Sequence, residues 1–354
     1  MRAIARAAGV SPATVAFVLN NRMDMAVAPE TRERVHKIAN ELGYQQHRLA
    51  RTIKSPLKHI GLVFGDLAFA QQSFTGPILV GAQRAALAGG YRPVLQTAPS
   101  FKEEPNPRRA AATLIELSRS RLLDGLILDK QYFLTDTVLH LVAAKVPLVM
   151  VNGGQVVDKR GRPVPSVTID DTLGGKLAAM HLLELGHRRA AIVSRPFETG
   201  RHAMRSTPVV KFTDGALNTF KAEGGTIAPD WICEGDFEDT TLAKAIITRI
   251  MSARQPPTAF IVGDDIIAMM IVQALQRAGY TVPEDVSVIG YGGWSLFGRV
   301  FEPRLTTVRV PLEDNGAVAT ELLIKNLSGL NNVQITLKPE MSPGLTTAKA
   351  PRPL

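Results

Sequence analysis

The sequence predicts an α/β protein in which an all-α headpiece precedes a core of two doubly wound, parallel-sheet lobes. Residues 1–44 show only helical periodicity, with helix start and stop residues in place. From His59 onward, short apolar runs alternate with helical periods, which is the pattern of βαβ units with buried parallel strands. So many strands are better housed in two sheets than in one.

Residues 1–20 predict two short helices around a tight turn. Gly9 supplies the turn, Ser11 stands at the N-cap of the second helix, and Pro12 fits its first position. The residues expected to face the core are Ile4, Ala5, Ala8, Val15, Val18 and Leu19. No capping residue precedes Ile4, which leaves two explanations open: a start upstream of Met1 or a weakened headpiece.

A third helix is predicted over residues 29–42, because two helices this short cannot stand alone. Pro29 begins it, Gly43 ends it, and its apolar face is Val35, Ile38, Ala39 and Leu42. The three segments form a helix-turn-helix, whose ordinary use is to read a DNA major groove. A plain helical packing unit and an organelle-targeting peptide are the alternatives, and the capped third helix argues against targeting.

Basic residues are concentrated at the N-terminus. The 354-residue chain carries a net charge of +9, of which residues 1–60 contribute +6 and the remainder +3. A basic head on a nearly balanced body predicts a polyanionic partner, and DNA fits better than a membrane surface because no helix has a bulky apolar face. With one cysteine, Cys233, and no apolar run of membrane-spanning length, we expect a cytoplasmic protein without an intramolecular disulfide.

A polar, basic connector at residues 45–58 separates the headpiece from the core. Leu49, Ala50 and Ile53 fall at helical spacing within it, and Pro56 ends this pattern. A helix this short buries almost nothing by itself, so we expect a hinge that folds on binding.

The core is expected to span residues 59–354. Predicted strands are 60–64, 92–96, 124–128, 147–151, 166–170, 190–194, 258–262 and 286–290. Predicted helices include 77–89, 108–120, 173–186, 212–223, 240–253, 264–278 and 312–327. The segment 153–165 is predicted to be an exposed basic loop, with the first crossover just after it and a second near Thr307. We therefore assign about 59–168 and 309–330 to lobe 1, and about 169–308 and 331–354 to lobe 2.

With these elements in order, the chain resembles the lactose-repressor/galactose-repressor (LacI/GalR) family over essentially its whole length. The headpiece motifs are IARAAGVSPATV, VLN and TRERVHKIANELGY. The core motifs are DGLIL, LLELGHRRAAIV, GDDIIAMMIVQALQRAGYTVPEDVSVIGY and PRLTTV. The resemblance implies a homodimeric transcription regulator, most often a repressor, that binds a near-palindromic DNA operator. It also implies a core like periplasmic sugar-binding proteins, with a small-molecule effector between the lobes.

The resemblance assigns DNA contacts to the second helix, the third helix and the hinge. The matching residues are Ser11, Pro12, Ala13, Thr14, Phe17, Asn20, Thr31, Leu49, Ala50 and Ile53. Pro12, Ala13 and Phe17 match base readers but carry no hydrogen-bonding side chain, so apolar contact and DNA shape would provide the specificity. Thr14, Asn20 and Thr31 match phosphate contacts, and Ile53 matches a minor-groove wedge or a contact with its dimer mate.

The resemblance also assigns effector contacts, with two departures. The matching residues are Phe74, Thr75, Asp129, Asn152, Thr199, Phe237 and Asp264. Phe212 stands where the family usually has an effector-binding arginine, and Gly292 stands where it usually has an aspartate. These changes argue against the usual sugar pose. The basic residues Arg195, Arg201, His202, Arg205 and Lys211 are open to two interpretations, a solvated loop or a site for an anionic ligand.

No sequence motif argues for catalysis, a cofactor or a metal. GYGG at 290–293 lacks dinucleotide-site spacing, and no phosphate-cradling loop or nucleophile elbow occurs. His181 and His187 are expected on the surface. The adjacent pairs at 170–171 and 264–265 should point apart and form no catalytic dyad. The competing functions are a solute-binding protein with the same core, against which the basic headpiece argues, and an enzyme on a doubly wound fold.

Overall fold

A computed structural model describes residues 2–19, 27–41, 58–64, 74–100, 103–194, 207–234, 240–293, 301–327 and 332–351. The chain forms two compact units, residues 1–57 and residues 58–354. The predicted hinge residues Leu49, Ala50 and Ile53 lie outside the described residues. So do Leu42 and Gly43 at the predicted end of the third helix, the contact candidates Asn20, Thr199 and Phe237, and the basic residues Arg195, Arg201, His202 and Arg205.

The first unit is a cluster of short helices, α1 (Arg2–Ala8), α2 (Pro12–Leu19) and α3 (Pro29–Glu41). Its core consists of Ile4, Ala5, Ala8, Val15, Val18, Leu19, Val35 and Ala39, with Val10, Val27 and Ile38 packed against it. Gly9 adopts a left-handed φ of 64°, and the amide of Val10 donates to the carbonyl of Ala5, so the chain turns directly from α1 into α2. The predicted helix-turn-helix is confirmed.

The second unit contains two sheets, each of six strands in the part of the chain that the structure describes. In the first sheet the order is β11 (Gln334–Leu337), β5 (Ser166–Ile169), β4 (Leu148–Val151), β3 (Gly125–Asp129), β1 (His59–Phe64) and β2 (Arg92–Thr97). These strands pair in parallel throughout.

The second sheet has the order β12 (Glu340–Ser342), β10 (Thr306–Arg309), β9 (Ser287–Gly292), β8 (Ala259–Val262), β6 (Ala190–Ser194) and β7 (Ile232–Glu234). β12 runs antiparallel to β10, and the other pairs are parallel. Two parallel sheets flanked by helices confirm the predicted α/β core.

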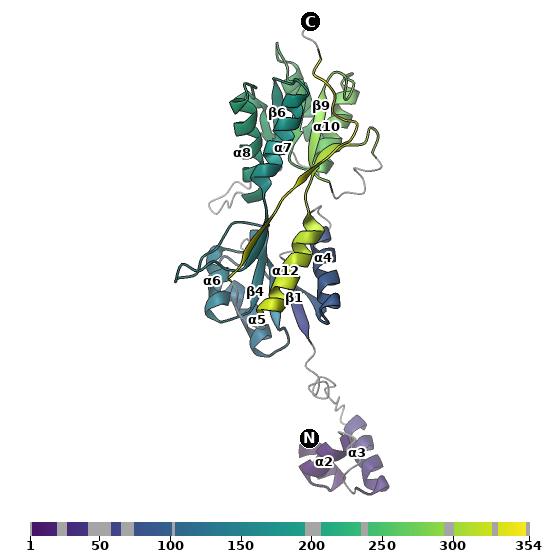
Figure 1. Ribbon diagram of the computed structural model, residues 1–354. Helices are drawn as coiled ribbons and strands as arrows, with labels where there is room; N and C mark the ends of the chain where they lie inside the picture. Colours follow the sequence, from purple (N-terminus) through teal and green to yellow (C-terminus); the bar gives the residue numbers. More distant parts are fainter. Residues whose placement is uncertain are drawn as a thin grey trace. The chain divides into compact units, whose positions relative to one another are not determined.

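Helices cover both faces of each sheet (Figure 1). On one face lie α4 (Thr75–Ala88) and α12 (Leu312–Asn326) over the first sheet, and α7 (Asp171–Glu184) and α8 (Thr207–Ala222) over the second. The opposite faces are covered by α5 (Pro107–Arg119) and α6 (Thr135–Ala143), and by α9 (Thr240–Met251) and α10 (Asp265–Arg277). The short helices η4 (Lys130–Tyr132) and η5 (Pro229–Trp231) complete the described elements.

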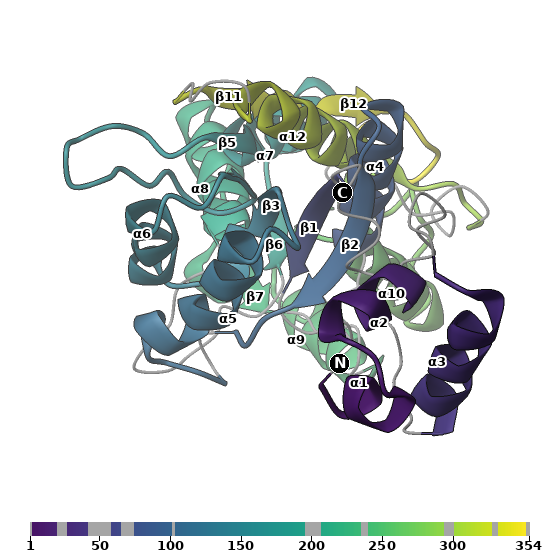
Figure 2. The same ribbon diagram turned by 90° about the horizontal axis from the view of Figure 1, so that it is seen from below.

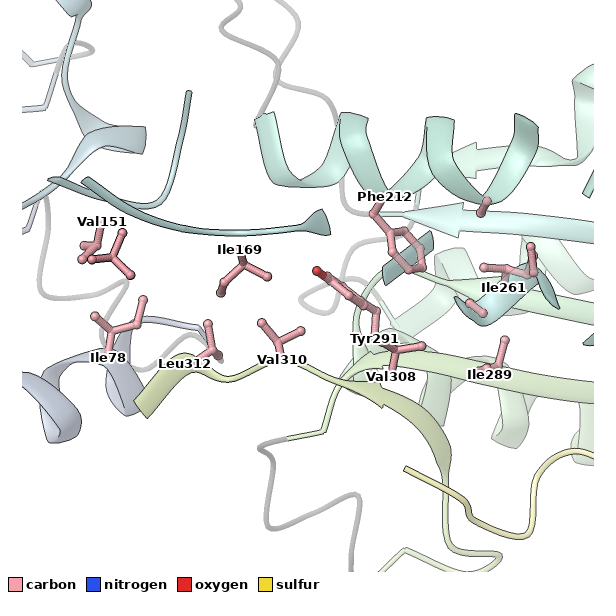
Figure 3. Close-up of a cluster of buried hydrophobic side chains, with 14 of the residues drawn as sticks. Ile78, Val151, Ile169, Phe212, Ile261, Ile289, Tyr291, Val308, Val310 and Leu312 are labelled. Atoms are coloured by element: carbon pink, nitrogen blue, oxygen red, sulfur yellow. The ribbon is translucent and has the colours of Figure 1, made fainter. Parts of the chain in front are cut away.

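One hydrophobic cluster runs through both sheets and the segments that join them. Ile169, Val310 and Leu312 lie where the chain passes between the sheets, and Tyr291 and Phe212 continue the cluster into the second lobe (Figure 3). All five side chains are less than 9% exposed. On one face of each sheet, the two lobes therefore share one continuous apolar cluster.

The chain passes between the sheets at three places. After β5 it enters α7, after β10 it enters α12, and after β11 it enters β12. The first two crossings are close to the predicted positions. The assignment of all of residues 331–354 to lobe 2 is wrong, because β11 pairs with β5 in the first sheet. β11 carries Gln and Thr among its four residues and has no buried apolar run that would have marked it as a strand.

His187 is also placed differently from the prediction. Its side chain is fully buried, with Nδ1 2.8 Å from the Thr258 hydroxyl and Nε2 3.0 Å from the Ser287 hydroxyl and 3.1 Å from the carbonyl oxygen of Ala348. Burial lowers the pKa of this imidazole. The residue follows a helix end and would be exposed there, but the C-terminal segment covers it. His181 is half-buried, with Nε2 2.9 Å from the Thr347 hydroxyl.

In each lobe, two helices cover the face of the sheet that carries the apolar cluster common to both lobes. Reciprocal glycine contacts hold these two helices together. Figures 1 and 2 both show α4 beside α12. A Cβ on Gly81 would overlap the carbonyl of Glu313, and a Cβ on Gly316 would overlap the carbonyl of Ile78. In each case, the carbonyl that the added Cβ would overlap belongs to the residue three positions before the glycine of the partner helix.

The same rule holds in the second lobe. A Cβ on Gly175 would overlap the carbonyl of Phe212, and one on Gly215 would overlap the carbonyl of Thr172. Helix backbones approach this closely only where no side chain intervenes, so four glycines are required for contact geometry.

Replacing Gly316 with alanine should destabilise the core by about 1–3 kcal/mol, because the new methyl group overlaps backbone rather than a movable side chain. Urea unfolding followed by tryptophan fluorescence would measure the loss. Gly154→Ala is the matched control, since nothing lies within 4 Å of its Cβ position and its φ is not left-handed. Equal stability of the two variants would contradict the contact argument.

Candidate functional site

The outward face of α2 presents the residues predicted to meet DNA. Val15, Val18 and Leu19 point into the core, which leaves the other face of the helix to solvent. The described candidates on this face are exposed (Ser11, Pro12, Ala13) or half-buried (Thr14, Phe17).

Ser11 caps α2 rather than projecting freely. Its hydroxyl accepts from the amide of Thr14 at 3.0 Å and lies 2.9 Å from the Thr14 hydroxyl. Thr31 is half-buried in the first turn of α3, where its amide donates to the carbonyl of Ala28. Arg6, Arg34 and Lys37 are exposed in the same unit and provide positive charge.

The effector candidates lie at the carboxyl ends of the parallel strands. Asp129 is the last residue of β3, Asn152 follows β4, Phe74 is the N-cap residue of α4, and Thr75 is the first residue of that helix. In the second sheet, Asp264 follows β8 and caps α10. The chain crosses between lobes from these same ends, so the carboxyl edges of the two sheets face each other, which is where ligands bind in open α/β sheets.

Asp129 and Asn152 are brought together at the first edge. Asp129 is fully buried, and its carboxylate accepts from the Asn152 amide at 3.1 Å and from the backbone and side-chain amides of Gln131. Burial raises the pKa of Asp129 to about 7, although these hydrogen bonds and nearby Lys130 act to lower it. Asn152 is half-buried and has a left-handed φ of 54°, a conformation that asparagine adopts more readily than most residues.

The other effector candidates are less accessible. Thr75 is 3% exposed and Asp264 is fully buried, with its carboxylate accepting from the amides of Ile266 and Ile267. Phe74 is half-buried and packs against the shared apolar cluster. Asp264 therefore acts as a helix cap in this conformation.

Two pairs of adjacent aspartates have the same arrangement: the first carboxylate caps a helix, and the second accepts hydrogen bonds from residues distant in sequence. Asp170 caps α7 through the amide of Leu173, while the neighbouring Asp171 accepts from the Tyr291 hydroxyl at 2.6 Å. Asp264 caps α10, while Asp265 accepts from the Thr307 hydroxyl and from the amide of Gly293, both at 2.6 Å. The side chains in each pair point apart, as predicted.

Burial raises the pKa of Asp171 and of Asp265 to about 6 in each case. The hydrogen bonds of Asp171 and Asp265 could not be predicted from the sequence, because their partners Tyr291 and Thr307 are distant along the chain. The repeated Asp-Asp at a strand-to-helix junction was the one available signal.

Phe212 occupies the position where the family resemblance implies an arginine. Its side chain is 1% exposed, and its ring lies 4.3 Å from that of Tyr291, centroid to centroid (Figure 3). At the position where the resemblance implies an effector-binding arginine, this chain has a buried aromatic pair, Phe212 and Tyr291, inside the second lobe.

The comparisons with known proteins agree with both units. Residues 1–46 match the family described as bacterial regulatory proteins, lacI family, and residues 179–347 match the periplasmic binding protein-like domain. The chain is 30% identical over 342 residues to the HTH-type transcriptional repressor PurR of Erwinia tasmaniensis, covering 95% of this chain and 92% of that protein. The chain belongs to the LacI family.

Solved structures of LacI-family proteins show the same fold. The transcriptional regulator CelR in complex with cellobiose is 25% identical, with a TM-score of 0.67 and coverage of 97% of this chain and 98% of that one. The lac repressor dimer bound to operator and an anti-inducer gives a TM-score of 0.67 at 22% identity, covering 98% of each chain. This LacI-family protein is a DNA-binding transcriptional regulator with an effector-binding core, and its headpiece disfavours the solute-binding alternative.

Two further observations concern membranes and metals. None of the described helices is long and apolar enough to cross a membrane. Within the described ranges, no group of three or more His, Cys, Asp or Glu side chains is placed to hold a metal ion.

Replacing Asp129 with asparagine should change how stability depends on pH. Because the folded pKa of about 7 lies above the ordinary 3.8, Asp129 contributes stability that is fully present below the lower value and is lost as pH rises through the higher one. The stability of the unaltered protein relative to Asp129→Asn should therefore fall between about pH 4 and about pH 7. Urea midpoints across this range would measure it, and parallel curves for both proteins would argue against a raised pKa.

Proposed function

We propose that this protein is a homodimeric repressor whose two headpieces each bind half of a near-palindromic operator, and whose DNA affinity changes when a small effector binds between the lobes. The observation that carries the proposal is the combination, in one chain, of a helix-turn-helix with an outward α2 face and a core with polar residues at two facing sheet edges. The assignment is regulation, not catalysis, and its place is the bacterial cytoplasm, where the DNA lies.

At the DNA, Pro12, Ala13 and Phe17 would contact bases through apolar surface, with thymine methyl groups as their natural partners. Ser11, Thr14, Asn20 and Thr31 would set the register on phosphates, and Leu49, Ala50 and Ile53 would enter the minor groove from the hinge. Exposure of Pro12 and Ala13 on α2 supports this role.

At the effector site, Phe74, Thr75, Asp129, Asn152 and Asp264 would line the facing edges, joined by Thr199 and Phe237. The pairing of Asp129 with Asn152 supports the first-lobe part of the site. Differential binding to two lobe arrangements would shift the population that favours operator binding.

Ala13→Asp should abolish operator binding, because it puts a carboxylate at an exposed α2 position where the DNA edge would lie. Gel retardation of the DNA upstream of the protein's own gene, compared with random duplex at several salt concentrations, would measure a loss of about 100-fold or more. Ala7→Asp is the control, since it adds the same charge at an exposed position of α1. Specific binding retained by Ala13→Asp would exclude α2 as the reading helix.

The candidate dimer surface is an exposed apolar patch on the α4 side of the first sheet. Val80 and Leu87 lie on one face of α4 and are 38% and 56% exposed. Leu95, 46% exposed on edge strand β2, is in register with Leu62, which packs in the cluster that contains α4 residues. Because register partners point to the same face, all three side chains lie on the α4 side.

Leu95→Lys should convert the dimer to a monomer, because a lysine at the centre of an apolar contact brings an unpaired charge. Sedimentation velocity of the full-length protein would report the oligomeric state. Leu122→Lys is the matched control, since Leu122 is 50% exposed but follows α5, which covers the opposite face. A Leu95→Lys variant that remains dimeric would place the interface elsewhere.

A further inference from the structure

Two helices of the first lobe end at a basic residue in a conformation that favours glycine. Arg121, after α5, and Lys145, after α6, each have a left-handed φ of 58°. At both ends, the amide of this residue donates to the carbonyl three positions back, and the next amide donates to the carbonyl five positions back. This is the Schellman motif, in which glycine usually fills the left-handed position because a Cβ is strained there.

Four other described helices of the core end in the same motif, and each of these four has glycine at the left-handed position. The glycines are Gly90 after α4, Gly186 after α7, Gly224 after α8 and Gly279 after α10. Arg121 and Lys145 therefore keep a strained backbone that the fold does not require. Compensation of the helix dipole does not explain them, because Arg119 and His140 already provide basic side chains in the last turns of α5 and α6.

Both residues lie at the amino edge of the first sheet. Arg121 precedes β3 and Lys145 precedes β4, while Lys58 stands directly before β1 and Arg92 is the first residue of β2. The amide of Arg92 donates to the carbonyl of Lys58, which joins the last two strand starts. Strands β4, β3, β1 and β2 are consecutive in the sheet, and adjacent strands lie about 4.8 Å apart. Lys58, Arg92, Arg121 and Lys145 therefore follow one another along this edge, and we call them the basic row.

The basic row presents its charge to solvent. All four of its side chains are exposed, and none of them forms an ion pair with another described residue. The Lys58 ammonium lies 5.3 Å from the centroid of the Tyr91 ring, a contact that leaves its charge in place. Asp124, between Arg121 and β3, is half-buried and accepts from the amide of His59 at 2.9 Å, so its carboxylate is engaged within the lobe. This edge therefore attracts an anionic partner.

The basic row also lies where the core is joined to the headpiece. The first compact unit ends at residue 57, so Lys58 is the first residue of the core unit. A stretch as long as residues 45–57 spans at most about 45 Å. Covalent linkage therefore keeps DNA that is bound by the headpiece near the core. The connector itself is a poor occupant of this edge, because it carries basic residues and no acid; they are Arg48, Arg51 and Lys54.

We propose that the basic row is a second DNA-binding surface of this protein, which contacts phosphates beside the sequence that the headpiece binds. The proposal rests on DNA binding by the headpiece and adds a contribution from the core. Lysine and arginine bind phosphates without reading bases, so the row raises affinity for any duplex and leaves the preference for the operator unchanged. Glycine at positions 121 and 145 would relieve backbone strain and lose two of these contacts.

The double variant Arg121→Gly with Lys145→Gly tests this exchange of stability for binding. Its Tm should rise by about 1–3 °C, because glycine removes the strain at both helix ends. Its affinity for operator and for random duplex should fall by about fivefold or more at about 50 mM salt, and the slope of log affinity against log salt should become shallower by about one to two. Thermal unfolding and gel retardation with the full-length protein would measure the two effects.

Two further double variants control for charge and for position. Lys159→Gln with Arg160→Gln removes the same charge from exposed positions elsewhere in the first lobe, and should leave affinity and salt slope close to those of the unaltered protein. Arg121→Lys with Lys145→Arg keeps the charge of the row and should bind DNA normally.

Three results would overturn the basic row. They are an unchanged salt slope in the glycine variant, an equal loss of affinity in the Lys159 and Arg160 variant, and a lower Tm in the glycine variant, which would make these side chains structural. Absence of operator preference in the unaltered protein would instead overturn the proposed function, and binding to random duplex would still test the row.

Discussion

The arrangement of the core depends on one feature: the chain passes between the two sheets from the carboxyl ends of parallel strands. After β5 and β10 the chain leaves one sheet at this edge and enters a helix of the other lobe. The third crossing follows the same edge, and β12 runs antiparallel because it starts there. The amide of Asp170 donates to the carbonyl of Leu337, which ties the first crossing to the third. The carboxyl edges therefore face each other, and the candidate effector residues lie along them.

Packing at the crossings imposes a second requirement. One apolar cluster continues from one lobe to the other through Ile169, Val310 and Leu312, while the opposite face of each sheet has a separate cluster of its own. On the same face, glycines let α4 contact α12 and α7 contact α8 at backbone distance. α7 and α12, the helices that directly follow a crossing, each belong to one of these helix pairs.

Buried carboxyls stabilise the carboxyl edge of the sheets, where the candidate effector residues lie. At each Asp-Asp junction, the first residue caps the following helix and the second holds a neighbouring strand through Tyr291 or Thr307. Most acidic groups at this edge are thus already hydrogen-bonded within the protein. Among the described residues, buried side-chain atoms without a hydrogen-bond partner occur in both lobes, at Ser166, Asn315 and Gln334 as well as at Ser194 and Thr213.

The sequence by itself determined the headpiece helices, the turn at Gly9, the Ser11 cap of α2 and the headpiece core. The reason is that the signals that begin and end a helix are local in sequence. It also determined the α/β class, most strands, and the separation of side chains within each Asp-Asp pair. Only the tertiary structure decided that β11 joins the first sheet and that His187 is buried, since both depend on strands and a C-terminal segment distant in sequence. It also decided that the Phe212 ring packs against that of Tyr291, because burial is a property of neighbours that spacing along the chain does not encode.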